Sequence, residues 1–145
     1  ADHAAVLGVG GCLNDGGDNI DVNQQFANKY INGNVPLIKV GRKPEGTYLH
    51  WLDVSVVVDK IGAQKMADAE NKRSQTISML TNKPNVVTPE DMVGHWFAKN
   101  AYVAIEAGSS FGYGGQNHMR MNVATSRRTL TAALDSMAGA LKNLA

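Results

Sequence analysis

The sequence predicts an α+β fold in which helices pack on one side of a small antiparallel sheet. Two segments indicate the sheet: residues 47–53 are rich in aromatic and β-branched side chains, and residues 119–123 alternate apolar and polar side chains. Residues 127–144 indicate the helical layer, because apolar side chains recur there every three or four positions. The βαβ pattern of a parallel sheet is absent. One domain of this type accounts for the 145 residues.

A first helix is predicted to start at Asp21. Asp21 is expected to cap this helix, with Gln24 as the capping-box partner three positions later. Gly33-Asn34 ends the helix, and Pro36 prevents it from resuming. An apolar face is expected at intervals of four residues, at Val22, Phe26 and Tyr30.

Two strands and a long helix are predicted next. Residues 37–40 form a short apolar strand, and residues 43–46 form a turn before the strand at 47–53. Alternation divides the second strand between two sides, and both are expected to be partly covered. The first side carries Tyr48, His50 and Leu52, and the second carries Leu49 and Trp51. A helix then runs from Asp59 to about Leu80.

The C-terminal half opens with a strong helix start. Thr88 caps this helix, Pro89 takes its first position, and two acidic residues follow at the positive end of the helix dipole. A strand is expected at 102–106 and a glycine-rich loop at 107–115. Ser126 caps the last helix. Its apolar stripe comprises Leu130, Ala133, Leu134, Met137, Ala138 and Leu141.

Composition excludes several classes of partner. Lys and Arg total 14 against 13 for Asp and Glu, so the net charge of +1 gives no long-range attraction to nucleic acid or to an anionic membrane. No segment approaches the roughly 20 apolar residues of a membrane span. No Lys or Arg precedes Lys29, whereas a secretory signal has a positive start. Cys12 is the single cysteine, which predicts no intramolecular disulfide and favours a cytoplasmic location.

Motifs for metals, nucleophiles and dinucleotides are also missing. The four histidines share no short spacing and Cys12 has no cysteine partner, so no metal site is expected. Neither Gly-x-Ser-x-Gly nor the P-loop pattern occurs. Residues 8–11 lack the preceding strand and the third glycine of a dinucleotide-binding fingerprint.

The segment 106–122 carries the candidate binding chemistry. Arg120 lies between Met119 and Met121, and adjacent residues of a strand face opposite sides. A guanidinium on a rigid strand suits two-point recognition of a carboxylate. The glycine-rich loop before it allows the backbone to approach a ligand closely. Taken alone, a strand arginine is more often part of a surface ion pair, so both interpretations stay open.

Three stretches together carry a family resemblance. Residues 45–53 read EGTYLHWLD, residues 107–112 read AGSSFG, and residues 119–124 read MRMNVA. In this order they resemble the C-terminal end of fold-type-I pyridoxal-phosphate (PLP) enzymes. The similarity is to the cystathionine β-lyase-like C–S lyases and the class I/II aminotransferases, and it covers about residues 21–144. It implies a small domain of the aminotransferase type at 21–145, after an irregular segment at 1–20.

The resemblance implies roles for six residues. Arg120 would bind the α-carboxylate of an amino-acid substrate and so orient the substrate on the cofactor, which supplies the electron sink. The residues implied to shape the wall around that arginine are Phe111, Gly112 and Asn122, and those implied to lie near the mouth are Gly46 and Tyr48.

The resemblance also implies that part of the enzyme is absent from this chain. In the family, the lysine that binds PLP lies on a large domain that precedes the small one. No Ser-x-x-Lys followed by an apolar, glycine-rich run occurs here. The chain is therefore expected to be inactive alone, as a piece of a parent enzyme that holds PLP, has a large PLP-binding domain and forms a homodimer.

Two other functions stay open. The same domain could serve a PLP-dependent aminotransferase, or it could be a non-catalytic binding module that keeps only the fold. A domain separated from a large partner is also expected to expose an apolar face and to self-associate. The candidates for that face are Trp51, Trp96, Phe97 and Phe111.

Overall fold

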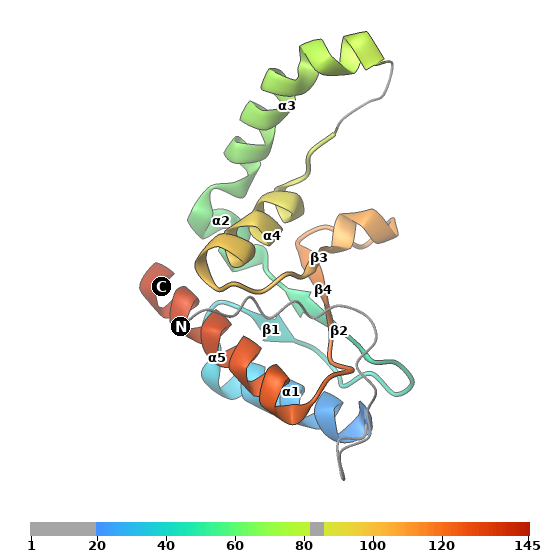
Figure 1. The fold of residues 1–145 in the computed structure, drawn as a ribbon, viewed down its shortest axis with the longest axis vertical. Helices are drawn as coiled ribbons and strands as arrows, with labels where there is room; N and C mark the ends of the chain where they lie inside the picture. The colour runs from blue at the N-terminus through green and yellow to red at the C-terminus, as the bar shows by residue number, and fades with distance from the viewer. Residues whose placement is uncertain (1–19, 82–85) are drawn as a thin grey trace.

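The computed structural model describes residues 20–81 and 86–145. These two ranges contain α-helices, short strands and a 3-10 helix (Figure 1). The elements are α1 (Ile20–Asn34), β1 (Lys39–Val40), β2 (Leu49–Asp53), α2 (Ser55–Ile61), α3 (Ala63–Thr81), α4 (Pro89–Asn100), β3 (Glu106–Ala107), the 3-10 helix η1 (Gly108–Phe111), β4 (His118–Asn122) and α5 (Arg127–Leu144).

The strands form one antiparallel sheet in the order β1-β2-β4-β3, so the two longest strands are central. One face of β2 and β4 is buried and carries His50, Leu52, Met119 and Met121. Residues of α1, α4 and α5 complete the hydrophobic core with this face. Figure 1 shows α1 and α5 side by side, while α3 extends away from the sheet. The predicted α+β fold with a small antiparallel sheet is confirmed.

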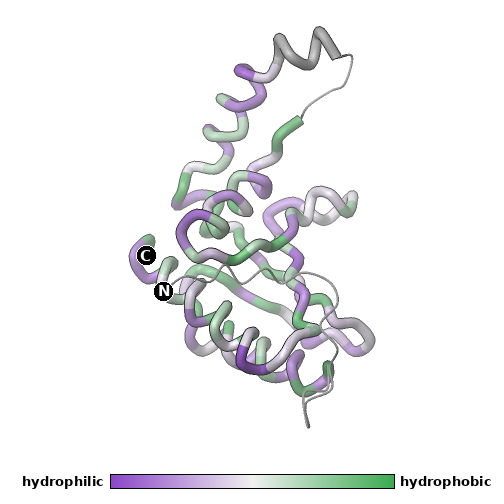
Figure 2. The backbone as a smooth tube through the Cα atoms, in the orientation of Figure 1, coloured by the Kyte–Doolittle hydropathy of each residue, from purple (hydrophilic) through white to green (hydrophobic). Residues whose placement is uncertain are grey.

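The last helix forms as its sequence pattern predicts. The buried residues of α5 are the six predicted apolar positions. The Ser126 hydroxyl accepts a hydrogen bond from the backbone N–H of Thr129 at 3.2 Å, as an N-cap does. Figure 2 shows hydrophilic and hydrophobic residues alternating along the helices, which is typical of helices with one buried face.

The start of α4 is also confirmed. The Thr88 hydroxyl accepts from the N–H of Asp91 at 3.2 Å, and the Asp91 carboxylate accepts from the N–H of Thr88 at 2.9 Å. This reciprocal pair is a complete capping box, and Pro89 occupies the first helical turn. Local hydrogen bonding therefore defines where α4 begins.

The first helix differs from the prediction in its cap and its buried face. Asp21 lies inside the first turn, because α1 already begins at Ile20. Val22 is 41% exposed, whereas Phe26 and Tyr30 only flank the core. The buried positions are Asn23, Gln24, Ala27 and Ile31. The apolar pattern could not predict this face because Asn23 and Gln24 on it are polar. The side-chain amide of Asn23 donates hydrogen bonds to the carbonyls of residues 123 and 125, at 3.1 and 2.7 Å.

The single helix predicted from Asp59 to Leu80 is wrong, because two helices occupy this region. The first, α2, begins earlier, at Ser55. It ends at Gly62, whose φ of +67° is left-handed backbone that glycine adopts without strain. The chain then resumes as α3 at Ala63. An isolated glycine inside a helical pattern marked this break, and the prediction overlooked it.

The strand predicted at 47–53 appears as Leu49–Asp53, and two other predicted strands are reduced to two residues each. The strand at 37–40 is reduced to β1, because Leu37 has a φ of +67°, outside the extended region. The strand at 102–106 is replaced by β3, because Tyr102 has a φ of +55°. Positive φ at a non-glycine residue is set by tertiary contacts, so the strand pattern could not predict it.

The predicted irregular segment at 1–20 lies outside the described residues except for Ile20, which begins α1. Within the described ranges, no helix has the length and hydropathy needed to cross a membrane.

Candidate functional site

Arg120 lies at the middle of β4, on the side of the sheet opposite the core. Its neighbours Met119 and Met121 are fully buried, whereas its own side chain is 28% exposed. The antiparallel register places Trp51 of β2 on one side of Arg120 and Glu106 of β3 on the other. The predicted division of this strand between two faces is confirmed.

The guanidinium of Arg120 has two partners. Its Nε donates a hydrogen bond to Oε2 of Glu106 at 2.6 Å, and its Nη2 donates to the same oxygen. Its Cζ lies 4.0 Å from the centroid of the Phe111 ring, which is a cation–π arrangement. A carboxylate therefore binds this arginine in the structure, although it comes from the chain itself.

Aromatic rings extend this group across the sheet. Trp51 stacks on His118 with 5.5 Å between ring centroids and an interplanar angle of 13°. The same indole meets the ring of Phe111 edge to face, at 6.4 Å. We call these five residues, Arg120, Glu106, Phe111, Trp51 and His118, the Arg120 cluster. It combines one cation, one anion and three rings on a half-exposed sheet face.

The loop that carries Phe111 is closed on itself. A Cβ added at Gly115 would lie 2.0 Å from the carbonyl oxygen of Gly108, so the two ends of the loop approach too closely for any side chain. Gly112 follows Phe111 with a φ of +97° and a ψ of −156°, a conformation that favours glycine. These glycines fix the turn that returns Phe111 toward Arg120.

The start of α4 holds the same loop from outside. The hydroxyls of Thr88 and Ser109 lie 2.9 Å apart in a hydrogen bond. The carboxylate of Glu90, which is only 3% exposed, accepts from the N–H of Asn117 at 2.6 Å. The loop is therefore anchored at both ends, and Phe111 has a defined position under the guanidinium.

The other predicted site residues lie around the cluster or away from it. Asn122 is on the same strand face as Arg120, but its side-chain oxygen accepts from the N–H of Ala124 at 2.8 Å and so stabilises the chain after β4. Gly46 and Tyr48 line a separate pocket of about 350 Å³ beside the start of α1, and Arg120 does not line it. The structure brings Arg120, Phe111 and Gly112 together and leaves Gly46 and Tyr48 apart.

Sequence reasoning assigned no role to Glu106 or His118. Glu106 is fourteen positions from Arg120, and only the pairing of β3 with β4 makes them neighbours. The sequence signal that could have predicted this contact is an acidic residue before the glycine-rich loop and a basic residue on the strand after it. Phe97, predicted on an exposed apolar face, is fully buried, while Trp51 and Phe111 are exposed by 38% and 48%.

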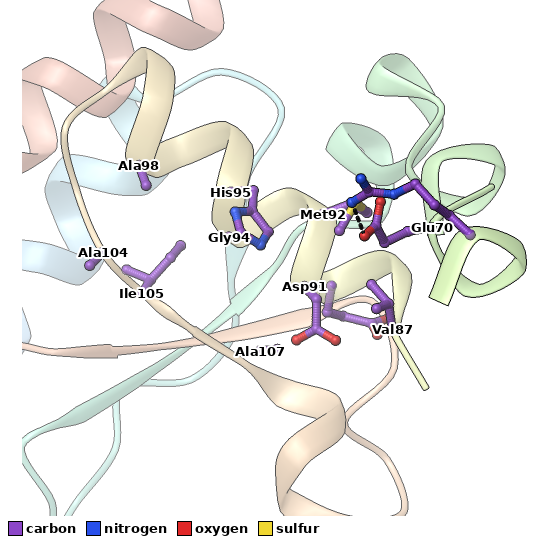
Figure 3. A pocket seen from close by; sticks show the side chains of 12 residues that line it. Glu70, Val87, Asp91, Met92, Gly94, His95, Ala98, Ala104, Ile105 and Ala107 are labelled. Carbon is purple, nitrogen blue, oxygen red and sulfur yellow. Dashed lines mark hydrogen bonds and ion pairs between the residues drawn. The ribbon is translucent and has the colours of Figure 1, made fainter. Parts of the chain in front are cut away.

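A second pocket, of about 670 Å³, lies between α3, α4 and the segment 104–107 (Figure 3). Glu70 and Arg73 of α3 form an ion pair that lines one side of this pocket. Figure 3 shows Asp91 and His95 extending from α4. Arg120 does not line this pocket. In the described part of the chain, no three His, Cys, Asp or Glu side chains are placed to hold a metal ion.

Comparison of sequences finds relatives for most of the chain. No protein-family model matches. A protein named "Putative cystathionine beta-lyase" from Mycobacterium tuberculosis is 32% identical over 122 residues, which are 84% of this chain and 26% of that protein. A protein of the same name from Mycobacterium leprae is 31% identical over 124 residues, 86% of this chain and 26% of that protein. The chain spans about a quarter of the length of these relatives.

Solved structures agree with this relation. A PLP-bound protein from Clostridium difficile, described as a "putative aminotransferase", is 31% identical with a TM-score of 0.58, over 84% of this chain and 24% of that one. Cystalysin from Treponema denticola, which contains PLP, is 25% identical with a TM-score of 0.60, over 87% and 24%. The PLP-bound C–S lyase from Staphylococcus hominis, at 22% identity and a TM-score of 0.59, shares the fold. The resemblance found in the sequence is confirmed.

Proposed function

We propose that this chain, which is related to PLP-dependent C–S lyases and aminotransferases over a quarter of their length, is the C-terminal small domain of an amino-acid C–S β-lyase. Residues 21–145 would form that domain. The observation that carries the proposal is the placement of Arg120, with its guanidinium stacked on Phe111 and bound to a carboxylate.

In this proposal Arg120 binds the α-carboxylate of the amino-acid substrate. Its N–H groups form a rigid donor fork, and the central strand and the Phe111 ring hold that fork in place. Such a contact fixes the position of the substrate before reaction, which is where binding contributes most to rate. Phe111, Gly112 and Asn122 would form the wall of the site. Gly46 and Tyr48, which line a separate pocket in this chain, would lie near its mouth.

The described residues do not by themselves fit PLP. The cofactor needs a lysine in an enclosed pocket, because desolvation lowers the pKa of a lysine amine and makes it reactive. Of the lysines in the described ranges, Lys43 is half-buried and paired with Asp21, and the others are exposed. We therefore expect the isolated chain to be inactive. The proposed parent enzyme supplies PLP on a large domain, is a homodimer and works in the cytoplasm.

An aminotransferase domain is the second candidate, and the 31% identity to the Clostridium difficile protein favours it. Both functions use Arg120 in the same way, so the Arg120 cluster does not separate them. A non-catalytic binding module with the same fold is the third candidate. It predicts that the Arg120→Ala variant binds carboxylates as the wild-type chain does.

The first test is a titration of the purified chain with PLP, followed by borohydride reduction and measurement of the intact mass. We expect no specific absorbance band and no single lysine adduct. One trapped lysine at full occupancy would contradict the proposal, because it would place a complete cofactor site within this chain.

The second test is an assay for pyruvate released from cystathionine or cysteine. We expect no turnover by the chain alone, with or without added PLP. Turnover would contradict the proposed division of the active site between this chain and a larger partner. In the full enzyme, pyruvate formation without an amino acceptor would distinguish a lyase from an aminotransferase.

A further inference from the structure

The carboxylate of Glu106 occupies the donor groups of Arg120 that the proposed function assigns to the substrate. We propose that Glu106 is an internal competitor: it holds the guanidinium until the substrate carboxylate displaces it, and so weakens substrate binding. This inference rests on the proposed function and adds a residue that sets the affinity of the same site.

The competition follows from which atoms are occupied. Nε and Nη2 of Arg120 both donate to Oε2 of Glu106. These two N–H groups form one edge of the guanidinium, an edge on which a carboxylate can bind with two parallel hydrogen bonds. A carboxylate that binds on this edge therefore competes with Glu106 for the same donors.

The surroundings of the guanidinium leave Glu106 as the group that can move. Phe111 covers a face of the guanidinium from an anchored loop, and Trp51 is held by its stack on His118. The side chain of Glu106 is 60% exposed, compared with 28% for Arg120. It also lies on a strand of only two residues, at the edge of the sheet. Rotation of this one side chain into water frees the donor edge and leaves the rest of the cluster in place.

The expected strength of the competition is modest. Exposed ion pairs are weak because water solvates both charges and because holding two long side chains costs entropy. Release of Glu106 should therefore tighten carboxylate binding by about two- to fivefold. This factor is the same for every carboxylate that displaces Glu106, so it lowers the affinity for substrates and for simple carboxylic acids alike.

The test uses the 145-residue chain and acetate as the probe. The side-chain Nε–Hε signal of Arg120 is followed by NMR during the titration and is assigned by its loss in Arg120→Lys. Glu106→Gln keeps the size of the side chain and removes its charge. Glu70→Gln is the matched control, because Glu70 pairs with Arg73 in an ion pair that is not part of the Arg120 cluster. Glu106→Asp keeps the charge but shortens the side chain, and it serves as a second variant.

We expect Glu106→Gln to lower the acetate dissociation constant at Arg120 by about two- to fivefold, Glu106→Asp to lower it less, and Glu70→Gln to leave it unchanged. Equal affinities in the wild-type chain and both Glu106 variants, with a clear Arg120 response, would overturn the competitor role and leave the proposed function intact. A folded Glu106→Gln variant whose Arg120 signal does not respond would contradict the proposed function itself.

Discussion

The two faces of the central strands differ sharply although they share one backbone. On the inner face of β4, Met119 and Met121 are fully buried among helices. On the outer face of the same strand, Arg120 binds Glu106 and stacks on Phe111 while remaining partly exposed. Residues one position apart therefore belong to the core and to the candidate site.

This difference shows how a small domain holds a binding group rigidly. The inner face is tied into the core by apolar contacts, so the backbone of β4 cannot shift without exposing that core. Arg120 inherits the rigidity of the strand while its side chain stays accessible to a ligand. Changes on the inner face should affect stability first, and changes on the outer face should affect binding first.

The largest effect is expected for a truncation on the inner face. Met121→Ala should lower the free energy of unfolding by about 2–5 kcal/mol, because it leaves a cavity among fully buried side chains. Urea denaturation measures this change. Met66→Ala is the control, since Met66 is 43% exposed and should lose far less. Similar losses for both variants would contradict the distinction between the two faces.

The next effect concerns pH and the buried histidine of the inner face. Burial lowers the pKa of His50 from 6.5 to about 4, and neither ring nitrogen has a hydrogen-bond partner within the described ranges. The unfolded chain binds a proton on His50 at pH values where the folded chain does not. The contribution of His50 to the free energy of unfolding is therefore fully present above pH 6.5. It should fall by about 3 kcal/mol as the pH drops to 4.

Two histidine variants test whether this pH dependence comes from the inner face of the sheet or from its outer face. Denaturation at several pH values should show a flatter profile between pH 6.5 and 4 for His50→Gln. The profile of His118→Gln should remain steep, because His118 lies on the outer face against Trp51. An unchanged slope in His50→Gln would show that another group dominates acid destabilisation.

A smaller effect is expected in the loop that joins β3 and β4. Gly115→Ala places a methyl group 2.0 Å from the carbonyl oxygen of Gly108, so the loop must open. We expect a loss of about 1–3 kcal/mol in stability and weaker packing of Phe111 on Arg120. Gly139→Ala in α5 is the control: apart from its own helix backbone and chain neighbours, no atom lies within 4 Å of its added Cβ, and it should stabilise the helix by about 1 kcal/mol. Thermal unfolding of both variants compares them directly.

The smallest effect on stability is expected for Arg120→Ala. This change removes an exposed ion pair and a cation–π contact, together about 1 kcal/mol. Its effect on binding should be the largest of the set, with loss of the acetate response that NMR detects at this site. A variant that unfolds at the same denaturant concentration as Met121→Ala would contradict the proposal that Arg120 serves binding more than stability.

The success of the sequence prediction varied with the range of the interactions involved. The cap residue and the first position of α4 and the apolar stripe of α5 were predicted residue by residue, because both depend on neighbours within one or two helical turns. The break at Gly62 and the shortened strands after Leu37 and Tyr102 were missed. Those features are backbone conformations that distant packing selects.

The candidate site shows the same division. The alternating pattern predicted that Arg120 would face away from Met119 and Met121, and the family resemblance selected it as the carboxylate-binding residue. Neither pattern could predict that Glu106 occupies its donors, because that contact depends on the register between β3 and β4.

The sequence alone therefore determined the α+β class, the starts of α4 and α5, and the face on which Arg120 lies. Each of these follows from periodicity or from hydrogen bonds between near neighbours. The tertiary structure decided which groups meet on that face. The close approach of Gly108 and Gly115 returns Phe111 to the guanidinium, and sheet pairing brings Glu106 to it from fourteen positions away. Contacts between segments far apart in the chain depend on the packing of the whole domain, so they emerge only once the domain has folded.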